Sequence, residues 1–195
     1  MPADFDARPI IVALAGPNGA GKTTFYHAHL ASAALRFVNA DDLASALGVD
    51  SVEAMRIAGE LRQVLRDQGE SFVFETVFSD PVGDKVDFLR EAVERGYAVV
   101  LCFIGLEGAA MSEERVAIRV LQGGHDVPSD RLAARFPRTM ANLAHATAAL
   151  PHVLVYDNSD LARPFRKVAE FERGRVVERH PPLPSWLAPI VAGAA

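Results

Sequence analysis

The sequence has a single cysteine, Cys102, among its 195 residues. One cysteine excludes an intrachain disulfide and a zinc site built from cysteines. It lies in the apolar run 99–104, which is typical of a buried strand, so we expect it to pack in the core rather than to act as a nucleophile. No spacing typical of metal ligands relates the histidines at positions 27, 29, 145, 152 and 180.

Long apolar runs and a basic excess are also missing. No run approaches the length of a membrane span, and the start, Met1 to Asp6, has neither a basic segment nor an apolar one behind it. The chain has 20 Lys and Arg against 25 Asp and Glu, a net charge of −5, which argues against a nucleic-acid track. We therefore expect a soluble cytoplasmic protein that binds neither membrane nor nucleic acid.

The most informative stretch that is present runs from Gly16 to Thr23 and reads GPNGAGKT. It meets every fixed position of the phosphate-binding loop G-x-x-x-x-G-K-[ST]. An apolar run, 10–15, precedes it and a helical pattern, 22–30, follows it, so backbone N–H groups and a helix N-terminus should face one bound phosphate. We expect Lys22 to reach the β- and γ-phosphates of a nucleotide and the Thr23 hydroxyl to bind Mg²⁺.

Strand and helix patterns alternate along the rest of the chain. Further strands are expected at 35–38, 71–76, 97–104 and 153–156, separated by helical segments. This alternation predicts a doubly wound α/β sheet of five parallel strands with right-handed crossovers. Two last segments, 165–171 and 175–179, flank Arg173-Gly174 as a C-terminal hairpin. The length and the 50% hydrophobic content predict one domain over residues 1–195.

Helix boundaries are expected at several capping residues. Ser51 should cap the helix that ends at Gly69, and Asp80-Pro81 should begin the following one with proline at its first position. Ser112 should cap a helix over 113–122, and Pro137 should kink or interrupt the one that runs from 129 toward 150.

Acidic residues follow two of the predicted strands. Asp41 comes just after the second strand, and Glu75 with Thr76 closes the third. Ligands bind beyond the carboxyl ends of such strands, so both acids should reach the phosphate loop. We expect Asp41 to be the base that accepts the proton of an acceptor alcohol, and Glu75 to hold a magnesium-bound water or an acceptor hydroxyl. Helix capping, by Asp41 or by its neighbour Asp42, and loop capping by Glu75 are the structural alternatives.

A basic segment lies between the fourth and fifth predicted strands. From residue 115 to residue 138 it contains five arginines, at 115, 119, 131, 135 and 138, and only two acids, Asp126 and Asp130. With a Gly123-Gly124 hinge, residues 112–150 are typical of a lid that closes over the transferred phosphate. For any single arginine, a solvated helix face is the alternative.

Together these motifs resemble the zeta toxin family over about residues 8 to 160. The matching segments are 16–24, 37–41, 74–76, 122–128, 142–143 and 156–159. The resemblance implies a nucleoside-kinase-like P-loop fold, ATP and Mg²⁺ as cofactors, and phosphorylation of UDP-N-acetylglucosamine on a sugar hydroxyl until an antitoxin binds.

The resemblance also implies site residues. Catalysis would fall to Asp41 and Lys22 with lid arginines that clamp the γ-phosphate, Arg119 with Arg131 or Arg135. The ATP-binding set is Gly16, Pro17, Asn18, Gly19, Ala20, Gly21, Lys22, Thr23, Thr24 and Asn158. The acceptor site would include Asp41, Glu75 and Thr76, and the metal site Thr23 and Glu75.

Three other functions stay open. The chain is compact relative to the toxins that act on the nucleotide sugar, and no uridine or sugar contact matches beyond Glu75-Thr76. A kinase for another alcohol, such as a nucleoside, a sugar or an antibiotic, fits the same motifs. A non-catalytic ATP-binding switch needs no base such as Asp41, and a polynucleotide kinase is disfavoured by the acidic balance.

Overall fold

The computed structural model describes residues 6–81, 83–123 and 127–194. Its strands in this part of the chain are β1 (Ile10–Ala15), β2 (Arg36–Val38), β3 (Phe72–Thr76), β4 (Ala98–Gly105), β5 (His152–Asp157), β6 (Arg166–Glu172) and β7 (Arg175–Arg179). They form one sheet in the order β2-β3-β1-β4-β5-β6-β7. The first five are parallel, and β6 and β7 continue the sheet as an antiparallel hairpin. The predicted fold class, five parallel strands and a C-terminal hairpin, is confirmed.

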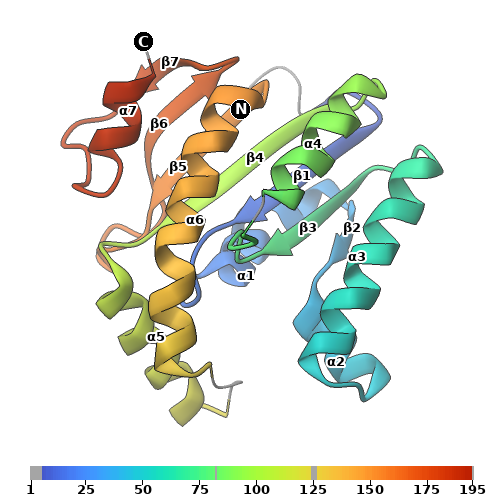
Figure 1. Cartoon of the computed structure of the whole chain (residues 1–195), viewed down its shortest axis with the longest axis horizontal. Helices are drawn as coiled ribbons and strands as arrows, with labels where there is room; N and C mark the ends of the chain where they lie inside the picture. The colour runs from blue at the N-terminus through green and yellow to red at the C-terminus, as the bar shows by residue number, and fades with distance from the viewer. Residues whose placement is uncertain (1–5, 82, 124–126, 195) are drawn as a thin grey trace.

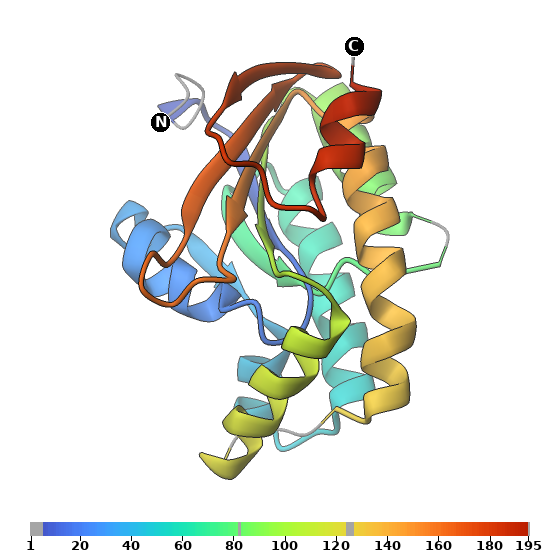
Figure 2. The same ribbon diagram turned by 90° about the vertical axis from the view of Figure 1, so that its left-hand side faces the viewer.

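Helices lie on both faces of this sheet (Figures 1 and 2). They are α1 (Lys22–Phe25), continued by the π-helix η2 (Tyr26–Leu30) and the 3₁₀ turn η3 (Ala31–Ala33), then α2 (Ala40–Leu47), α3 (Ser51–Asp67), α4 (Asp84–Glu94), α5 (Ala109–Leu121), α6 (Ser129–Ala149) and α7 (Ala188–Gly193). One core cluster joins α3, α4, α6 and α7 to one face of the sheet. A second joins α1, η2 and the start of α5 to the other.

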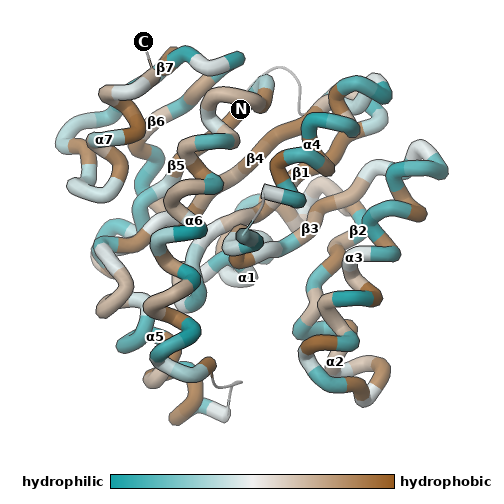
Figure 3. The backbone as a smooth tube through the Cα atoms, in the orientation of Figure 1, coloured by the Kyte–Doolittle hydropathy of each residue, from teal (hydrophilic) through white to brown (hydrophobic). Residues whose placement is uncertain are grey.

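The central strands are apolar throughout, as strands covered on both faces require. Every residue of β1 is buried, and alternate residues enter the two clusters: Ile11 and Ala13 face α3, α4 and α6, whereas Val12 faces α1. Figure 3 shows the apolar colour along β1 and β4 in the middle of the molecule. This packing fixes the carboxyl end of β1, where the phosphate loop begins.

Cys102 lies in β4 and is buried, as predicted. Burial raises the pKa of its thiol to about 12, so the thiolate is not formed near neutral pH.

Trp186, in the Pro-rich C-terminal segment, packs against Phe103 of β4. A side chain at Gly105 would strike the Trp186 ring, with 2.2 Å to its nearest atom, so this glycine permits the close packing.

Several predicted helix boundaries are wrong. The cap of α3 is Asp50, not Ser51, because its carboxylate accepts from the N–H groups of Val52 and Glu53 at 2.9 Å. Helix α4 starts at Asp84 after Gly83, so Asp80-Pro81 belongs to the loop before it. The cap of α3 is thus one residue before the expected one, and the cap of α4, Gly83, is three residues after Asp80.

The boundaries of the lid segment also differ from expectation. Helix α5 starts at Ala109, which places Ser112 inside the helix, where its hydroxyl donates to the Asn18 carbonyl at 2.6 Å. Pro137 does not interrupt α6, which is helical over its whole length. Gly123 follows the last turn of α5 and has φ +88°. Gly124, the other half of the expected hinge, lies outside the described residues, and so do positions 125 and 126 of the 122–128 motif.

Candidate active site

The phosphate loop connects the buried end of β1 to the first turn of α1. Gly16 has φ +148°, and a Cβ there would lie 2.2 Å from the Ile104 carbonyl oxygen of β4, so only glycine fits. Gly21 is the N-cap of α1 with φ +84°. These conformations let the loop fold back over the strand ends, as the motif predicts.

Two polar side chains from distant parts of the sequence hold this loop. Ser112 of α5 donates to the Asn18 carbonyl, as described above, and the Asn158 amide donates to the Ala20 carbonyl at 2.9 Å. Asn158 is itself buried after β5, where its side-chain oxygen accepts from the Phe165 N–H at 3.3 Å. Asn158 therefore supports the backbone of the loop.

Lys22 is the first residue of α1, at the end of the phosphate loop, and its side chain is buried. Its ammonium donates to the Pro17 carbonyl at 3.1 Å and lies 3.8 Å from a Glu75 oxygen. Burial lowers the pKa of Lys22, against the opposing influence of Glu75 and Asp41. The charge is thus held at an energetic cost that a bound phosphate would offset, a pattern typical of functional sites.

Glu75 is the centre of a small polar cluster. Its Oε2 accepts hydrogen bonds from the Thr23 hydroxyl at 2.8 Å and from the Asn39 amide at 3.0 Å. A carboxylate and a hydroxyl supply the hard oxygen ligands that Mg²⁺ prefers. The described ranges, this cluster included, contain no group of three or more His, Cys, Asp or Glu that could hold a metal ion, so any ion here would need further oxygen ligands from phosphate or water. The side chains of Thr23 and Glu75 thus fit the predicted metal role chemically.

Asp41 lies in the first turn of α2 and is exposed. The helix cap is Asn39, whose side-chain oxygen accepts from the Asp41 N–H at 2.7 Å, so neither Asp41 nor Asp42 has the capping role that the sequence left open. The Asp41 carboxylate has no hydrogen-bond or ion-pair partner within the described ranges. It is therefore available to a ligand.

Arginines of α5 and α6 line the same pocket. Arg119 comes from α5, and Arg131 and Arg135 come from α6, in contact with α5. Burial and the like charges of Arg131 and Arg138 lower the pKa of Arg135. Arg115, by contrast, donates to the Ser159 carbonyl at 3.2 Å. Arg131 and Arg135 both line the pocket, and their like charges are unfavourable without a bound anion, as expected of an anion site.

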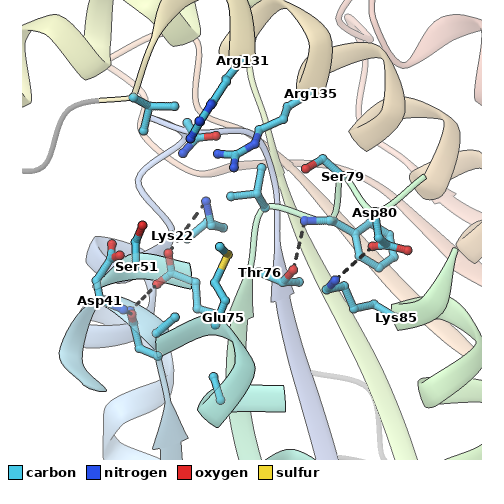
Figure 4. A pocket seen from close by; sticks show the side chains of 18 of the residues that line it. Lys22, Asp41, Ser51, Glu75, Thr76, Ser79, Asp80, Lys85, Arg131 and Arg135 are labelled. Atoms are coloured by element: carbon cyan, nitrogen blue, oxygen red, sulfur yellow. Dashed lines mark hydrogen bonds and ion pairs between the residues drawn. The ribbon is translucent and has the colours of Figure 1, made fainter. Parts of the chain in front are cut away.

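Many of the side chains described above line one pocket of about 320 Å³ (Figure 4). Of the predicted site residues, it is lined by Asn18, Gly19, Lys22, Asp41, Glu75, Thr76, Arg119, Arg131 and Arg135. The loop residues Gly16, Pro17, Ala20 and Gly21 and the side chains of Thr23, Thr24 and Asn158 do not line it. The sequence reasoning missed Ser51, Arg62, Ser79, Asp80 and Lys85, which line it as well. Of these five residues, only Ser79 and Asp80 could have been indicated by the sequence, because they follow a predicted strand end.

Residues 77–80, which follow β3, form one wall of this pocket, and α6 holds them in place. The Thr139 hydroxyl donates to the Val77 carbonyl at 2.9 Å. The buried Asn142 amide donates to the carbonyls of Phe78 at 3.0 Å and Asp80 at 2.9 Å. This gives the 142–143 motif a structural role in shaping the pocket.

Helices able to cross a membrane are absent from the described part of the chain.

Comparison with family models gives a match to the family described as "Zeta toxin" over residues 37–169, more than half of the chain. The matched range begins after the phosphate loop and includes Asp41, Glu75 and the lid. A search of curated proteins gives no match.

Solved structures share the fold. One chain of the AvrRxo1-ORF1:AvrRxo1-ORF2 complex with sulphate ions is 19% identical over 96% of this chain and 65% of its own, with a TM-score of 0.72. A second structure of that complex is described as containing ATP, with 19% identity, coverage of 88% and 61%, and a TM-score of 0.61. This chain thus spans less than two thirds of the length of those chains.

Another similar structure is from the PezAT chromosomal toxin–antitoxin system of Streptococcus pneumoniae. It is 20% identical and covers 85% of this chain and 72% of its own, with a TM-score of 0.56. A putative kinase from Chloroflexus aurantiacus is 16% identical, with coverage of 81% and 90% and a TM-score of 0.55. At these identities the similarity establishes the P-loop kinase fold.

Proposed function

The chain belongs to the zeta toxin family, and from this membership we propose that it is an ATP-dependent phosphotransferase acting on a hydroxyl group of a small molecule. The observation that carries the proposal is the convergence of Lys22, Asp41 and the lid arginines on one pocket beyond the ends of the parallel strands. Phosphoryl transfer needs such a set: a phosphate cradle, a base near the acceptor and cations around the moving group.

ATP is the proposed donor. The loop 16–23 and the N-terminus of α1 would bind its β-phosphate, with Lys22 between the β- and γ-phosphates. An ATP-bound structure of the AvrRxo1 complex supports this choice of nucleotide. Arg119, together with Arg131 or Arg135, would stabilise the charge of the transferred group, a role worth about 10³ to 10⁵ in rate where an arginine supplies it.

Asp41 would be the general base. As the acceptor oxygen bonds to the γ-phosphorus, the bond from that phosphorus to the bridging oxygen breaks, and ADP leaves with the electron pair. The Asp41 carboxylate takes the proton that the acceptor hydroxyl loses. Its exposure and its lack of a partner in the described ranges favour this role over helix capping.

Thr23 and Glu75 would hold Mg²⁺ through oxygen atoms, directly or through water. The ion would supply charge neutralisation to the bound phosphates. Glu75 and Thr76 also line the pocket beside Asp41, so they would orient the acceptor. An enzyme that consumes ATP in this way would work in the cytoplasm.

UDP-N-acetylglucosamine is the acceptor that family membership favours, with another alcohol as the alternative. The same membership favours a toxin that an antitoxin protein restrains. The PezAT structure, which is named for a toxin–antitoxin system, supports this assignment, as does the two-component AvrRxo1-ORF1:AvrRxo1-ORF2 complex.

The test uses γ-labelled ATP with magnesium and a panel of nucleotide sugars, nucleosides, sugars and aminoglycosides. The wild-type protein should label at least one of them, and Asp41→Asn should lower that transfer by at least about 10², the lower end of what a general base contributes. ATP affinity, measured by calorimetry, should change little in the same variant.

Asp42→Asn is the matched control, because Asp42 is a neighbouring exposed acid that does not line the pocket. It should transfer phosphate like the wild type. Tight ATP binding without transfer to any acceptor would instead favour a non-catalytic ATP-binding switch. Loss of ATP affinity with retained turnover in Asp41→Asn would refute its assignment as base.

A further inference from the structure

Part of the pocket is not used by the proposed transfer. In Figure 4 the group around Lys22 and Asp41 lies at one side, and Ser79, Asp80 and Lys85 lie at the other. Ser79 and Asp80 belong to the loop between β3 and α4, and Lys85 lies in the first turn of α4. Any molecule that fills the pocket from Asp41 outward meets this second group of side chains.

Asp80 is a buried carboxylate with one charged neighbour. Its side chain is only 5% exposed, and the Lys85 ammonium lies 3.4 Å from its Oδ1. Neither carboxylate oxygen has a hydrogen-bond partner in the described part of the chain, although the Asp80 carbonyl is bound by Asn142. A buried carboxylate in this state is costly without a cation. The pair therefore holds the Lys85 ammonium at the pocket wall.

The position of Lys85 is not explained by the stability of α4. A cation in the first turn of a helix faces the positive end of the helix dipole, which is unfavourable. Its side chain is 28% exposed and lines the pocket. Together these observations indicate a lysine placed for a ligand rather than for the helix.

The pocket is positively charged within an acidic protein. Its lining has six cations, Lys22, Arg62, Lys85, Arg119, Arg131 and Arg135, against three carboxylates, Asp41, Glu75 and Asp80. The whole chain carries a net charge of −5. In the described ranges, no carboxylate forms an ion pair with Arg135, and the like charges of Arg131 and Arg138 act on it unfavourably. If Lys22, Arg119 and Arg131 serve the transferred phosphate, Lys85 and Arg135 remain for a second anion.

We infer that Lys85, positioned by Asp80, and Arg135 bind a negatively charged group of the acceptor, a phosphate or a carboxylate, on the side of the pocket away from Asp41. This inference rests on the proposed kinase function. It narrows the acceptor to an alcohol that carries its own anion, such as a sugar phosphate, a nucleotide sugar or a sugar acid. It disfavours neutral nucleosides and the cationic aminoglycosides.

The experiment compares acceptors that differ in charge but share a hydroxyl. The pairs are N-acetylglucosamine with its 1-phosphate and with UDP-N-acetylglucosamine, and glucose with gluconate, so that phosphate and carboxylate are tested separately. KM and kcat are measured for the wild type, Lys85→Gln, Arg135→Gln and Asp80→Asn. Arg90→Gln and Arg138→Gln are matched controls, because Arg90 and Arg138 lie on the same two helices but do not line the pocket.

The wild type should prefer an anionic member of a pair. Lys85→Gln and Arg135→Gln should each raise the KM for that acceptor by roughly 10- to 100-fold, the worth of one hydrogen bond to a charged group. The KM for its neutral counterpart should change far less, and both control variants should behave like the wild type. Asp80→Asn should raise the same KM selectively, whereas a merely structural role would lower kcat for both members of the pair.

Wild-type transfer that favours neutral acceptors would overturn the inference while leaving the kinase proposal standing. The same holds if Lys85→Gln and Arg135→Gln change the KM equally for the charged and the neutral member of a pair. Transfer to none of the acceptors, with ATP bound, would overturn the kinase proposal and the acceptor site with it. The two failures are therefore distinguishable.

Discussion

Replacing Lys22 with methionine should raise the stability of the nucleotide-free protein while removing most of its response to nucleotide. The Lys22 side chain is only 6% exposed, and burial lowers the pKa of its ammonium despite the nearby carboxylates of Glu75 and Asp41. A lowered pKa means that the folded state holds this charge less well than the unfolded chain does. Methionine has a similar length and no charge, so it removes that cost.

The nucleotide response can be worked out from binding linkage. At a nucleotide concentration 100 times Kd, binding stabilises the wild type by about 2.7 kcal/mol. Proteins of this size shift by about 2–4 °C per kcal/mol, so Tm should rise by about 5 to 11 °C. If Lys22→Met weakens binding about 100-fold, the same concentration equals its Kd, and the gain falls to about 0.4 kcal/mol. Phosphoryl transfer should fall by about 10² or more.

The assay is thermal unfolding followed by circular dichroism, with and without ADP and magnesium. Lys167→Met is the matched control, with an effect of opposite sign. Although burial opposes it, the hydrogen bonds to Glu170 and Glu178 raise the pKa of Lys167, so the fold favours its charge. Lys167→Met should therefore lower the Tm of the nucleotide-free protein and leave the nucleotide response intact.

The pH dependence gives an independent check of the sign. For Lys22, the cost of the charge is present in full below its lowered folded pKa and vanishes as pH rises to the unfolded value of 10.5. The stability difference between Lys22→Met and the wild type should shrink over that window. A lower Tm for nucleotide-free Lys22→Met near pH 7, or an unchanged nucleotide response, would refute this account of Lys22.

Three further changes test the architecture of the site. Gly16→Ala should destabilise the protein by on the order of 3 kcal/mol or more and abolish nucleotide binding, because its Cβ would meet the Ile104 carbonyl at 2.2 Å; urea unfolding and calorimetry would measure both effects. Asn142→Ala should cost about 2 to 4 kcal/mol in urea unfolding, because it removes a buried hydrogen bond to the Phe78 carbonyl and a partly buried one to the Asp80 carbonyl; a loss below about 1 kcal/mol would contradict its role. Cys102 should resist alkylation in the native protein at pH 8, and mass spectrometry that shows rapid modification would contradict its raised pKa of about 12.

Much of the fold could be predicted from local pattern. Buried parallel strands read as apolar runs, and β1, β4 and β5 lie within a residue or two of the expected bounds. The helix starts were less predictable, because several residues near each start can cap it and packing selects one. Asn39 rather than Asp41, and Asp50 rather than Ser51, accept the first N–H groups of α2 and α3.

The sequence by itself determined the phosphate loop, because its glycines, lysine and threonine act over one short turn whose geometry is local. It also placed Asp41 and Glu75 at the correct edge of the sheet, since the carboxyl ends of parallel strands share that edge. Only the tertiary structure decided which distant side chains meet there. Asp80, Lys85 and Arg135 line one pocket, and α6, through Asn142, holds the loop that carries Asp80. No periodicity in the chain encodes hydrogen bonds between segments about sixty residues apart.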